Sequence, residues 1–142
     1  PLLVIIARAL GFERALDESG AARITAEWMM GVAVTNPWLM LAVIYLITTV
    51  VTEVVTNNAA VALMFPIALS TANSLDVNPM PFIMAVMMAG SAAFATPIGY
   101  QTNLMVYGPG GYKFTDFTRV GLPLNFLSGA VVIVLAPIVW PF

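Results

Sequence analysis

The sequence contains no cysteine and no histidine. Disulfide bonds, thiolate chemistry, Cys/His zinc sites and histidine acid–base catalysis are therefore excluded within these 142 residues. Charge is also scarce, because five basic and seven acidic residues leave a formal net charge of −2. Such a balance does not favour nucleic acid as a partner. We expect no cofactor and no transition-metal site, and, because no nucleophile–base pair is apparent, no enzyme.

Apolar residues, in contrast, make up 61% of the sequence, against 8% charged residues. Soluble domains carry roughly 25% charged residues, so this composition indicates a membrane protein. At about 20 residues for each crossing, the length allows roughly four to six membrane elements. The first residues include neither an initiator Met nor a basic leading segment, and they resemble the end of a helix. We therefore expect a fragment of a longer protein rather than a signal peptide.

Two apolar stretches are interrupted by short polar clusters, and each cluster ends in Asn. In TEVVTNNAAVALMFP, residues 52–66, the polar triplet 56–58 separates the apolar runs 38–51 and 59–69. In ATPIGYQTN, the triplet 101–103 follows the apolar run 82–95. All three runs are shorter than the roughly 20 residues of a membrane span. Only 121–140 is an uninterrupted run of that length, and the connection before it is expected to hold one helical turn at most.

These interruptions have a physical interpretation. Irregular backbone at membrane depth survives only when it is buried in protein or lines a cavity, so short arms around a polar tip predict a re-entrant hairpin. Discontinuous helices are typical of the binding sites of secondary transporters. Amide and hydroxyl oxygens suit hard cations, and N–H groups suit anions. The alternative is structural, because Asn and Thr within membrane helices also hydrogen-bond neighbouring helices without any ligand.

Glu53 requires a separate interpretation. An ionisable residue at membrane depth is a functional hypothesis by default. It could carry a proton, or it could have a structural role, paired in the protein interior with backbone groups or with Arg. The sequence leaves both roles open.

Two segments carry a family resemblance. TEVVTNNAAVALMFPIA resembles the second signature of the divalent-anion:sodium symporters, in which a Ser-Asn-Thr triplet follows a Thr-Glu pair. FATPIGYQTNLMVYGPGGYKFTDFTRVGLPLN resembles the second helix break of that family. The chain is most similar to citrate-transporter-like permeases with a TrkA-type regulatory domain, over nearly its whole length. The resemblance implies an all-α polytopic membrane protein, with residues 1–142 as the C-terminal one of two inverted repeats of a secondary transporter.

The resemblance also implies boundaries for the parts of this repeat. A span ends at 1–10, interfacial arm helices occupy 12–34, a re-entrant hairpin 38–72, a broken transmembrane helix 80–108 and the last transmembrane helix 120–140. The implied partners are a small anion, the lipid bilayer, the missing N-terminal repeat of the same protein and a second copy in a homodimer. The implied location is a bacterial-type inner or plasma membrane.

The same resemblance assigns candidate site residues by position. Those implied to bind substrate are Thr56, Asn57, Asn58, Gln101, Thr102 and Asn103. Those implied to bind sodium are Thr52, Asn57 and the backbone carbonyls of Val55 and Gly99. The chain departs from the family where its triplet reads Thr-Asn-Asn, and where Gln101 and Thr102 replace two prolines. These departures leave the identity of the anion open.

The function implied is sodium-coupled symport of a divalent anion, either a di- or tricarboxylate or sulfate, with sodium as the coupling ion. Two alternatives remain. One is a proton-coupled transporter or sodium/proton exchanger of the same superfamily that uses Glu53. The other is a membrane subunit that binds an anion without transporting it.

Overall fold

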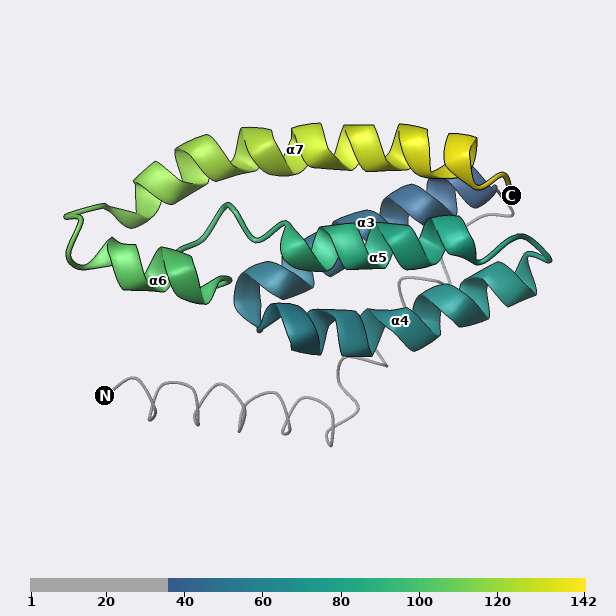
Figure 1. The fold of residues 1–142 in the computed structure, drawn as a ribbon, viewed down its shortest axis with the longest axis horizontal. Coiled ribbons are helices and arrows are strands. Elements are labelled where there is room, and N and C mark those ends of the chain that lie inside the picture. Colours follow the sequence, from purple (N-terminus) through teal and green to yellow (C-terminus); the bar gives the residue numbers. More distant parts are fainter. Residues whose placement is uncertain (1–35) are drawn as a thin grey trace.

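The computed structural model describes residues 36–142, and this part of the chain is helical and contains no strand (Figure 1). The expected span end at 1–10 and the expected arm at 12–34 lie outside the described residues. The helices are α3 (Pro37–Val54), α4 (Asn57–Ser74), α5 (Met80–Ser91), α6 (Gln101–Tyr107) and α7 (Phe114–Val139).

The first interruption of the helical chain falls at residues 55–56. α3 ends where the N–H of Val55 donates to the carbonyl of Val51 at 2.9 Å. α4 starts with Thr56 as its N-cap, whose hydroxyl accepts from the N–H of Ala59 at 3.4 Å. An extended backbone at both residues separates the two helices. The helix–break–helix arrangement expected around the first polar triplet is therefore present.

The first arm, α3, is longer than the apolar run 38–51 from which a short arm was expected. α3 has 18 residues, and by length and composition it is long and apolar enough to cross a membrane. The reason lies in its ends rather than in its apolar run. Asn36 caps the start by accepting from the N–H of Trp38 at 3.0 Å, and the helix continues through the polar residues Thr52 and Glu53. Helix ends depend on satisfied backbone groups, which a count of apolar residues does not detect.

The second interruption separates α5 from α6. α5 ends at Ser91, residues 92–100 are not helical, and α6 begins at Gln101. Within 80–108 an irregular segment of nine residues, 92–100, separates α5 from α6. That the two helices form one broken transmembrane helix stays a prediction. This segment contains Pro97 and Gly99, which explains in part why the helix does not continue.

α7 begins earlier than expected. The sequence predicted one helical turn at most near Asp116 and a last span from residue 120, whereas one helix runs from Phe114 to Val139. Its start is a capping arrangement in which Asp116 Oδ2 accepts from the N–H of Lys113 at 2.8 Å. Pro123 lies inside α7 and removes only one backbone donor there.

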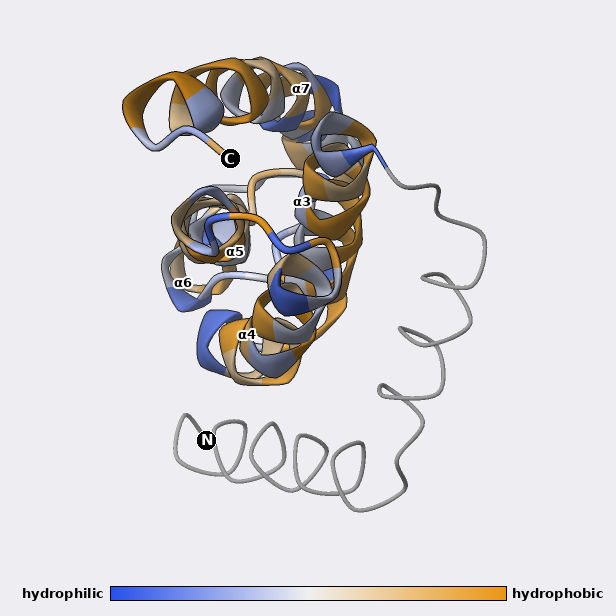
Figure 2. Cartoon of the chain, turned by 90° about the vertical axis from the view of Figure 1, so that its right-hand side faces the viewer, coloured by the Kyte–Doolittle hydropathy of each residue, from blue (hydrophilic) through white to orange (hydrophobic). Residues whose placement is uncertain are grey.

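α3 and α5 contact each other, and each also contacts α4 and α7, so this pair lies at the centre of the described part. The end-on view shows α5 beside α3, with α7 on one side of this pair and α4 on the other (Figure 2). The largest fully buried apolar side chains come from α3 and α5; they are Leu41, Ile44, Tyr45, Phe82 and Val86. Tyr45 is satisfied within the core, because its hydroxyl lies 2.8 Å from Ser128 Oγ of α7.

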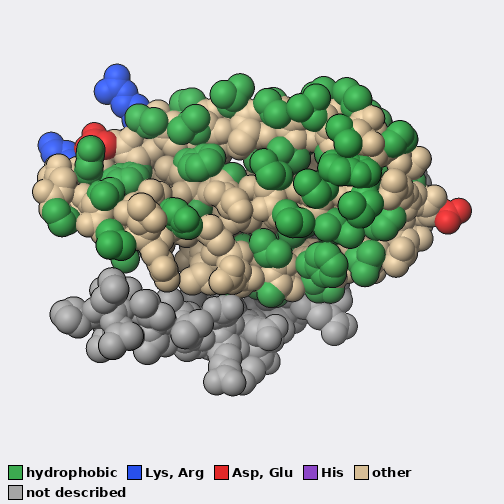
Figure 3. All heavy atoms as spheres, viewed as in Figure 1, with side chains coloured by type: hydrophobic (Ala, Val, Ile, Leu, Met, Phe, Trp, Pro, Cys, Tyr) green, Lys and Arg blue, Asp and Glu red, His purple; other side chains and the backbone are tan. Residues whose placement is uncertain are grey.

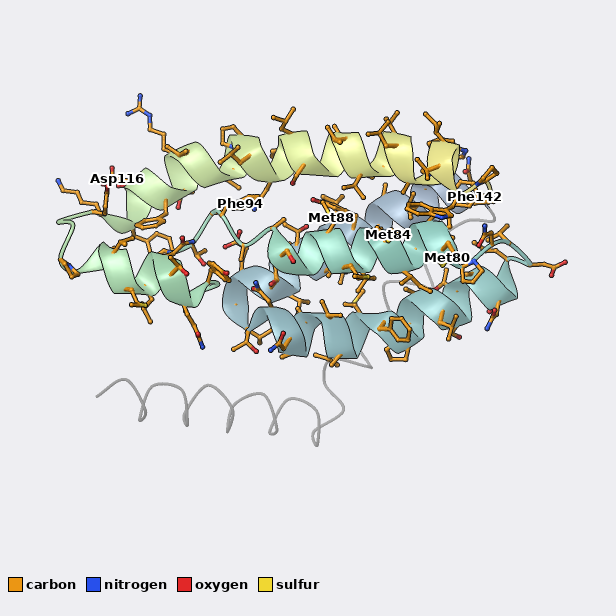
Figure 4. The ribbon with its side chains drawn as sticks, viewed as in Figure 1. Met80, Met84, Met88, Phe94, Asp116 and Phe142 are labelled. Atoms are coloured by element: carbon orange, nitrogen blue, oxygen red, sulfur yellow. The ribbon has the colours of Figure 1, made fainter. Side chains whose placement is uncertain are left out.

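The outside of the bundle remains apolar. Hydrophobic side chains are spread over the face shown in Figure 3, with basic side chains and an acidic side chain at one end and a second acidic side chain at the opposite end. Met80, Met84 and Met88 follow each other along α5 (Figure 4), and most of the long side chains of α7 are exposed. Besides α3, α7 is also long and apolar enough to cross a membrane. Exposed apolar patches of this extent suit lipid or further protein rather than water.

Aromatic clusters lie at both ends of the bundle. Phe142 packs edge-to-face against Trp38 and at a tilt against Phe82, with ring centroids 5.6 and 5.8 Å apart, respectively. At the other end, beside α6, Phe117 contacts Tyr107 and Tyr112 at 6.0 and 5.8 Å. Such residues are enriched at the two interfaces of a membrane.

Candidate functional site

The two interruptions meet at Thr52, which is fully buried near the end of α3. Thr52 Oγ1 lies 2.9 Å from Asn57 Oδ1 at the start of α4 and 2.9 Å from the carbonyl oxygen of Gly90 near the end of α5. A hydroxyl has a single hydrogen to donate, so these two acceptors compete for it. The hairpin and the broken helix are thus joined through one buried hydroxyl.

The Asn57 side chain gathers oxygen atoms around one of its ends. That end lies 3.2 Å from the carbonyl oxygens of both Gly90 and Gly99, and 2.9 Å from Thr52 Oγ1. With Nδ2 turned to this end, the amide donates to all three oxygens. With Oδ1 there, four oxygens face one another, which is the ligand chemistry of a hard cation. Asn57 can therefore satisfy these oxygens itself or join them as a fourth ligand.

Gly99 permits this convergence because it lacks a side chain. A Cβ atom at Gly99 would stand 2.8 Å from the carbonyl oxygen of Thr52 and 3.1 Å from Glu53 Cα. The irregular segment therefore lies directly on the last turn of α3. A side chain at this position would push the Gly99 carbonyl away from Asn57.

Helix polarity around the site favours ions of both signs. α3 and α5 end here, so their free carbonyl groups give a partial negative charge. α4 begins here, and its free N–H groups give a partial positive charge. The geometry can hold a cation among the carbonyl groups and an anion at the start of α4, without a basic side chain from residues 36–142.

Glu53 accepts three hydrogen bonds through its carboxylate. The N–H groups of Ala95 and Thr96 donate to its two oxygens at 2.8 Å each, and Asn125 Nδ2 of α7 donates at 2.8 Å. Its backbone carbonyl also accepts from Thr96 Oγ1 at 2.9 Å. Glu53 is thus paired with backbone groups and an amide. These contacts match the structural role considered from the sequence, in which Glu53 pairs with backbone groups in the protein interior.

Asn103 joins α6 to the same segment. Asn103 Nδ2 donates to the carbonyl of Ala93 at 3.2 Å and to that of Thr96 at 3.4 Å. Asn103 is thus the residue of the second polar triplet that contacts the irregular segment 92–100. Gln101 and Thr102 are exposed in the first turn of α6.

The remaining candidates lie at the first interruption. Thr56 caps α4, the Val55 backbone separates α3 from α4, and Asn58 is exposed in the first turn of α4. The structure therefore brings together Thr52, Asn57 and Gly99 by direct contact. Glu53 hydrogen-bonds Ala95 and Thr96 of the irregular segment, and Thr52 and the Asn57 amide reach the carbonyls of Gly90 and of Gly90 with Gly99, respectively.

Three residues of this site, Gly90, Thr96 and Asn125, were not predicted from the sequence. Gly90 supplies a carbonyl, and nothing in its apolar surroundings marks it. Thr96 and Asn125 were in segments quoted for the family resemblance but received no role. Asn125 could have been found, because an amide in the middle of a long apolar run is as unusual as Glu53 in its own run.

No group of three or more Asp or Glu side chains that could hold a metal ion occurs among residues 36–142. A cation bound here would thus depend on neutral oxygens. Apolar helices with polar groups gathered at their interruptions define a class, the helical membrane transport proteins. Similarity to known proteins gives the particular family.

The family model described as citrate transporter matches residues 1–142, which is the whole chain. The chain belongs to the citrate transporter family. It is 42% identical over 127 residues to an uncharacterized transporter, sll0640, of Synechocystis sp., covering 89% of the chain and 21% of the relative. It is 39% identical over 122 residues to sodium/sulfate cotransporter 1 of Chlamydomonas reinhardtii, covering 84% and 14%. Solute carrier family 13 member 1 of Mus musculus is 33% identical over 103 residues, covering 72% and 17%.

These relatives match the divalent-anion:sodium symporters, so the resemblance found in the sequence is confirmed. They are transporters, and the family and the apolar helices support an integral membrane protein. The chain spans 14% to 21% of the length of these three relatives.

Proposed function

We propose that this chain is the C-terminal membrane repeat of a sodium-coupled symporter of a divalent anion. The observation that carries the proposal is the meeting of Thr52, Asn57 and two glycine carbonyls at the junction of the interrupted helices. Three oxygens, from Thr52, Gly90 and Gly99, converge on one end of the Asn57 side chain, and Asn57 Oδ1 would supply a fourth oxygen ligand when a cation binds. Membership of a transporter family that includes a sodium/sulfate cotransporter supports the same conclusion.

The sodium ion would lie among Thr52 Oγ1, Asn57 Oδ1 and the carbonyls of Gly90 and Gly99, close to the Val55 backbone. All of these ligands are neutral, so the ion would keep its positive charge in the site. That charge would attract the anion and replace the basic side chain that the site lacks. Coupling then has an electrostatic cause, because the anion binds weakly until the cation is present.

The anion would bind at the start of α4, where free N–H groups and the side chains of Thr56, Asn57 and Asn58 are available. Gln101, Thr102 and Asn103 at the start of α6 would complete this side of the site. Asn57 would contact both ions, one through each end of its amide. A matching polar tip from an N-terminal repeat would enclose the anion.

In the complete protein, α3 and α4 would form a re-entrant hairpin, and α5 and α6 the two halves of a broken transmembrane helix. The hairpin and broken helix would move against the rest of the protein to alternate access to the site. The protein would form a homodimer in an inner or plasma membrane of the bacterial type. The substrate class would be sulfate or a di- or tricarboxylate, and the names of the relatives favour testing sulfate first.

A proteoliposome uptake panel on the full-length parent tests this proposal. Sulfate, succinate and citrate are supplied at fixed pH, with and without an inward sodium gradient. We expect sodium to accelerate uptake of at least one anion. Uptake that responds to a pH gradient and ignores sodium would instead establish a proton-coupled transporter, and anion binding without flux would establish a binding subunit.

A further inference from the structure

Glu53 occupies a position that is unfavourable for an acid. It lies in the last turn of α3, where the free carbonyl groups already give the helix end a partial negative charge. Its side chain is partly buried, and α3 and α4 contain no other carboxylate. A negative charge at such a place needs compensating contacts from elsewhere in the fold.

Those contacts come from the irregular segment 92–100. The N–H groups of Ala95 and Thr96 have no helical partner, because the helix has already ended at Ser91. Each donates to the Glu53 carboxylate at 2.8 Å. Buried N–H groups without a partner are strongly unfavourable, so the carboxylate satisfies the backbone donors that the helix break leaves free.

A second set of bonds links the same residue to the proposed sodium site. Thr96 Oγ1 donates to the Glu53 carbonyl at 2.9 Å and accepts from the N–H of Gly99 at 3.1 Å. The carbonyl of Gly99 lies 3.2 Å from the Asn57 amide. A continuous series of contacts therefore runs from Glu53 through Thr96 and Gly99 to Asn57.

Asn125 fixes the carboxylate from a third element. Its Nδ2 donates to Glu53 Oε1 at 2.8 Å, and the residue is buried in the middle of α7. Its Oδ1 has no hydrogen-bond partner among residues 36–142. Because one end of this buried amide is unsatisfied within the described part, the bond to Glu53 is the contact that accounts for a polar residue here.

We propose that Glu53 is a positioning residue for sodium, whose charged carboxylate holds segment 92–100 so that the Gly99 carbonyl faces Asn57. Asn125 keeps the carboxylate in place from α7. This inference rests on the proposed function and deepens it, because it gives Glu53 a role in sodium binding without contact with the ion. Three donors hold the carboxylate in one position, which is the arrangement that a fixed anchor requires.

Glu53→Gln in the full-length parent tests the inference. The variant keeps the size of the side chain but replaces one acceptor oxygen with an NH2 group that would face a backbone N–H. Initial uptake is measured against sodium concentration in proteoliposomes, with whichever of sulfate, succinate or citrate the wild type transports. We expect the half-saturating sodium concentration to rise roughly tenfold or more, the factor expected when a charged hydrogen bond is lost.

Asn125→Ala supplies a second variant that keeps the carboxylate and both backbone donors. We expect a rise of roughly threefold in half-saturating sodium, because one of three donors is removed. Ser91→Ala is the matched control, since its exposed hydroxyl donates only within α5, to the Met87 carbonyl at 3.2 Å. Its sodium dependence should equal that of the wild type. Size-exclusion chromatography in detergent confirms that each protein is folded.

The inference is overturned if folded Glu53→Gln has the same half-saturating sodium concentration as the wild type. It is also overturned if the variant loses pH-driven uptake while its sodium dependence is unchanged. If Glu53→Gln does not fold, the half-saturating sodium concentration of Asn125→Ala is compared with the wild type instead, and an unchanged value overturns the inference. The sodium dependence of wild-type uptake is measured before any variant is compared. Uptake that does not depend on sodium overturns the proposed function itself.

Discussion

Thr52 and Asn57 lie on opposite sides of the interruption between α3 and α4, and their side chains meet, with Thr52 Oγ1 2.9 Å from Asn57 Oδ1. Thr52 also reaches the carbonyl of Gly90, so this pair lies against the end of α5, whereas Asn58 beside it is exposed. Both residues therefore belong to one buried oxygen cluster. Each can be tested separately.

Thr52→Val replaces the hydroxyl with a methyl group of nearly the same shape. We expect weaker sodium binding by about 1–2 kcal/mol, because a cation ligand and a buried hydrogen bond are lost together. The measurement is half-saturating sodium for uptake by the full-length parent. Thr52→Ser, which keeps the hydroxyl, is the control and should stay close to the wild type. Equal effects of the two variants would show that the hydroxyl is not a ligand.

Asn57→Ala removes the residue that we place between cation and anion. Cation-dependent uptake should be abolished while the protein remains folded in detergent, because Asn57 lies in the first turn of α4 and not in the apolar core. Asn58→Ala is the matched comparison, since Asn58 is the adjacent and exposed Asn. It should keep the sodium dependence and alter only the affinity for the anion. Wild-type sodium dependence in Asn57→Ala would refute the assignment.

Gly99→Ala tests whether close backbone approach positions the carbonyl. The added Cβ would stand 2.8 Å from the Thr52 carbonyl oxygen, so the break must move away from α3. We expect destabilisation of about 1–3 kcal/mol, the usual cost of overpacking, together with weaker sodium binding. Gly108→Ala serves as control because a Cβ there has no neighbour within 4 Å. Denaturation in detergent and sodium titration measure the two effects, and equal stability of both variants contradicts the prediction.

The contact of Tyr45 with Ser128 joins α3 to α7 inside the core. Tyr45→Phe and Ser128→Ala should each lower the free energy of unfolding by about 0.5–1.5 kcal/mol, and the double variant by less than their sum. A double-mutant cycle in detergent measures this coupling. Strict additivity would show that the two hydroxyl groups do not interact. Uptake should be unaffected in all three variants because neither residue contacts the oxygen cluster.

The positions of both interruptions could be predicted from the sequence, because polar triplets within apolar runs are hard to place in a continuous membrane helix. The lengths of α3 and α7 could not. Their starts depend on local caps, at Asn36 and at Lys113 with Asp116, which carry more weight than the apolar pattern. A hydrophobicity pattern shows where an apolar run ends. It does not show where capping hydrogen bonds allow the helix to begin or end.

The candidate site, like the fold, could be predicted only in part from the sequence. The family resemblance pointed to Thr52, Asn57 and Gly99, which the structure brings into one cluster. The partners of Glu53 could not be found in this way, because two are backbone N–H groups 42 and 43 residues further along the chain. Backbone donors have no sequence signature, and only the tertiary approach of the break to α3 exposes them to the carboxylate.

The length of α7 has a consequence for the lipid around it. A helix of 26 residues is about 39 Å long, whereas the hydrocarbon core of a bilayer is about 30 Å thick. With its apolar part in the core, the first turns of α7, which carry Asp116 and Arg119, reach the headgroup layer unless the helix tilts. α7 also contacts the break through Thr118, whose hydroxyl donates to the carbonyl of Ala95 at 3.2 Å. A change in bilayer thickness that tilts α7 would therefore bear directly on the segment that carries Gly99.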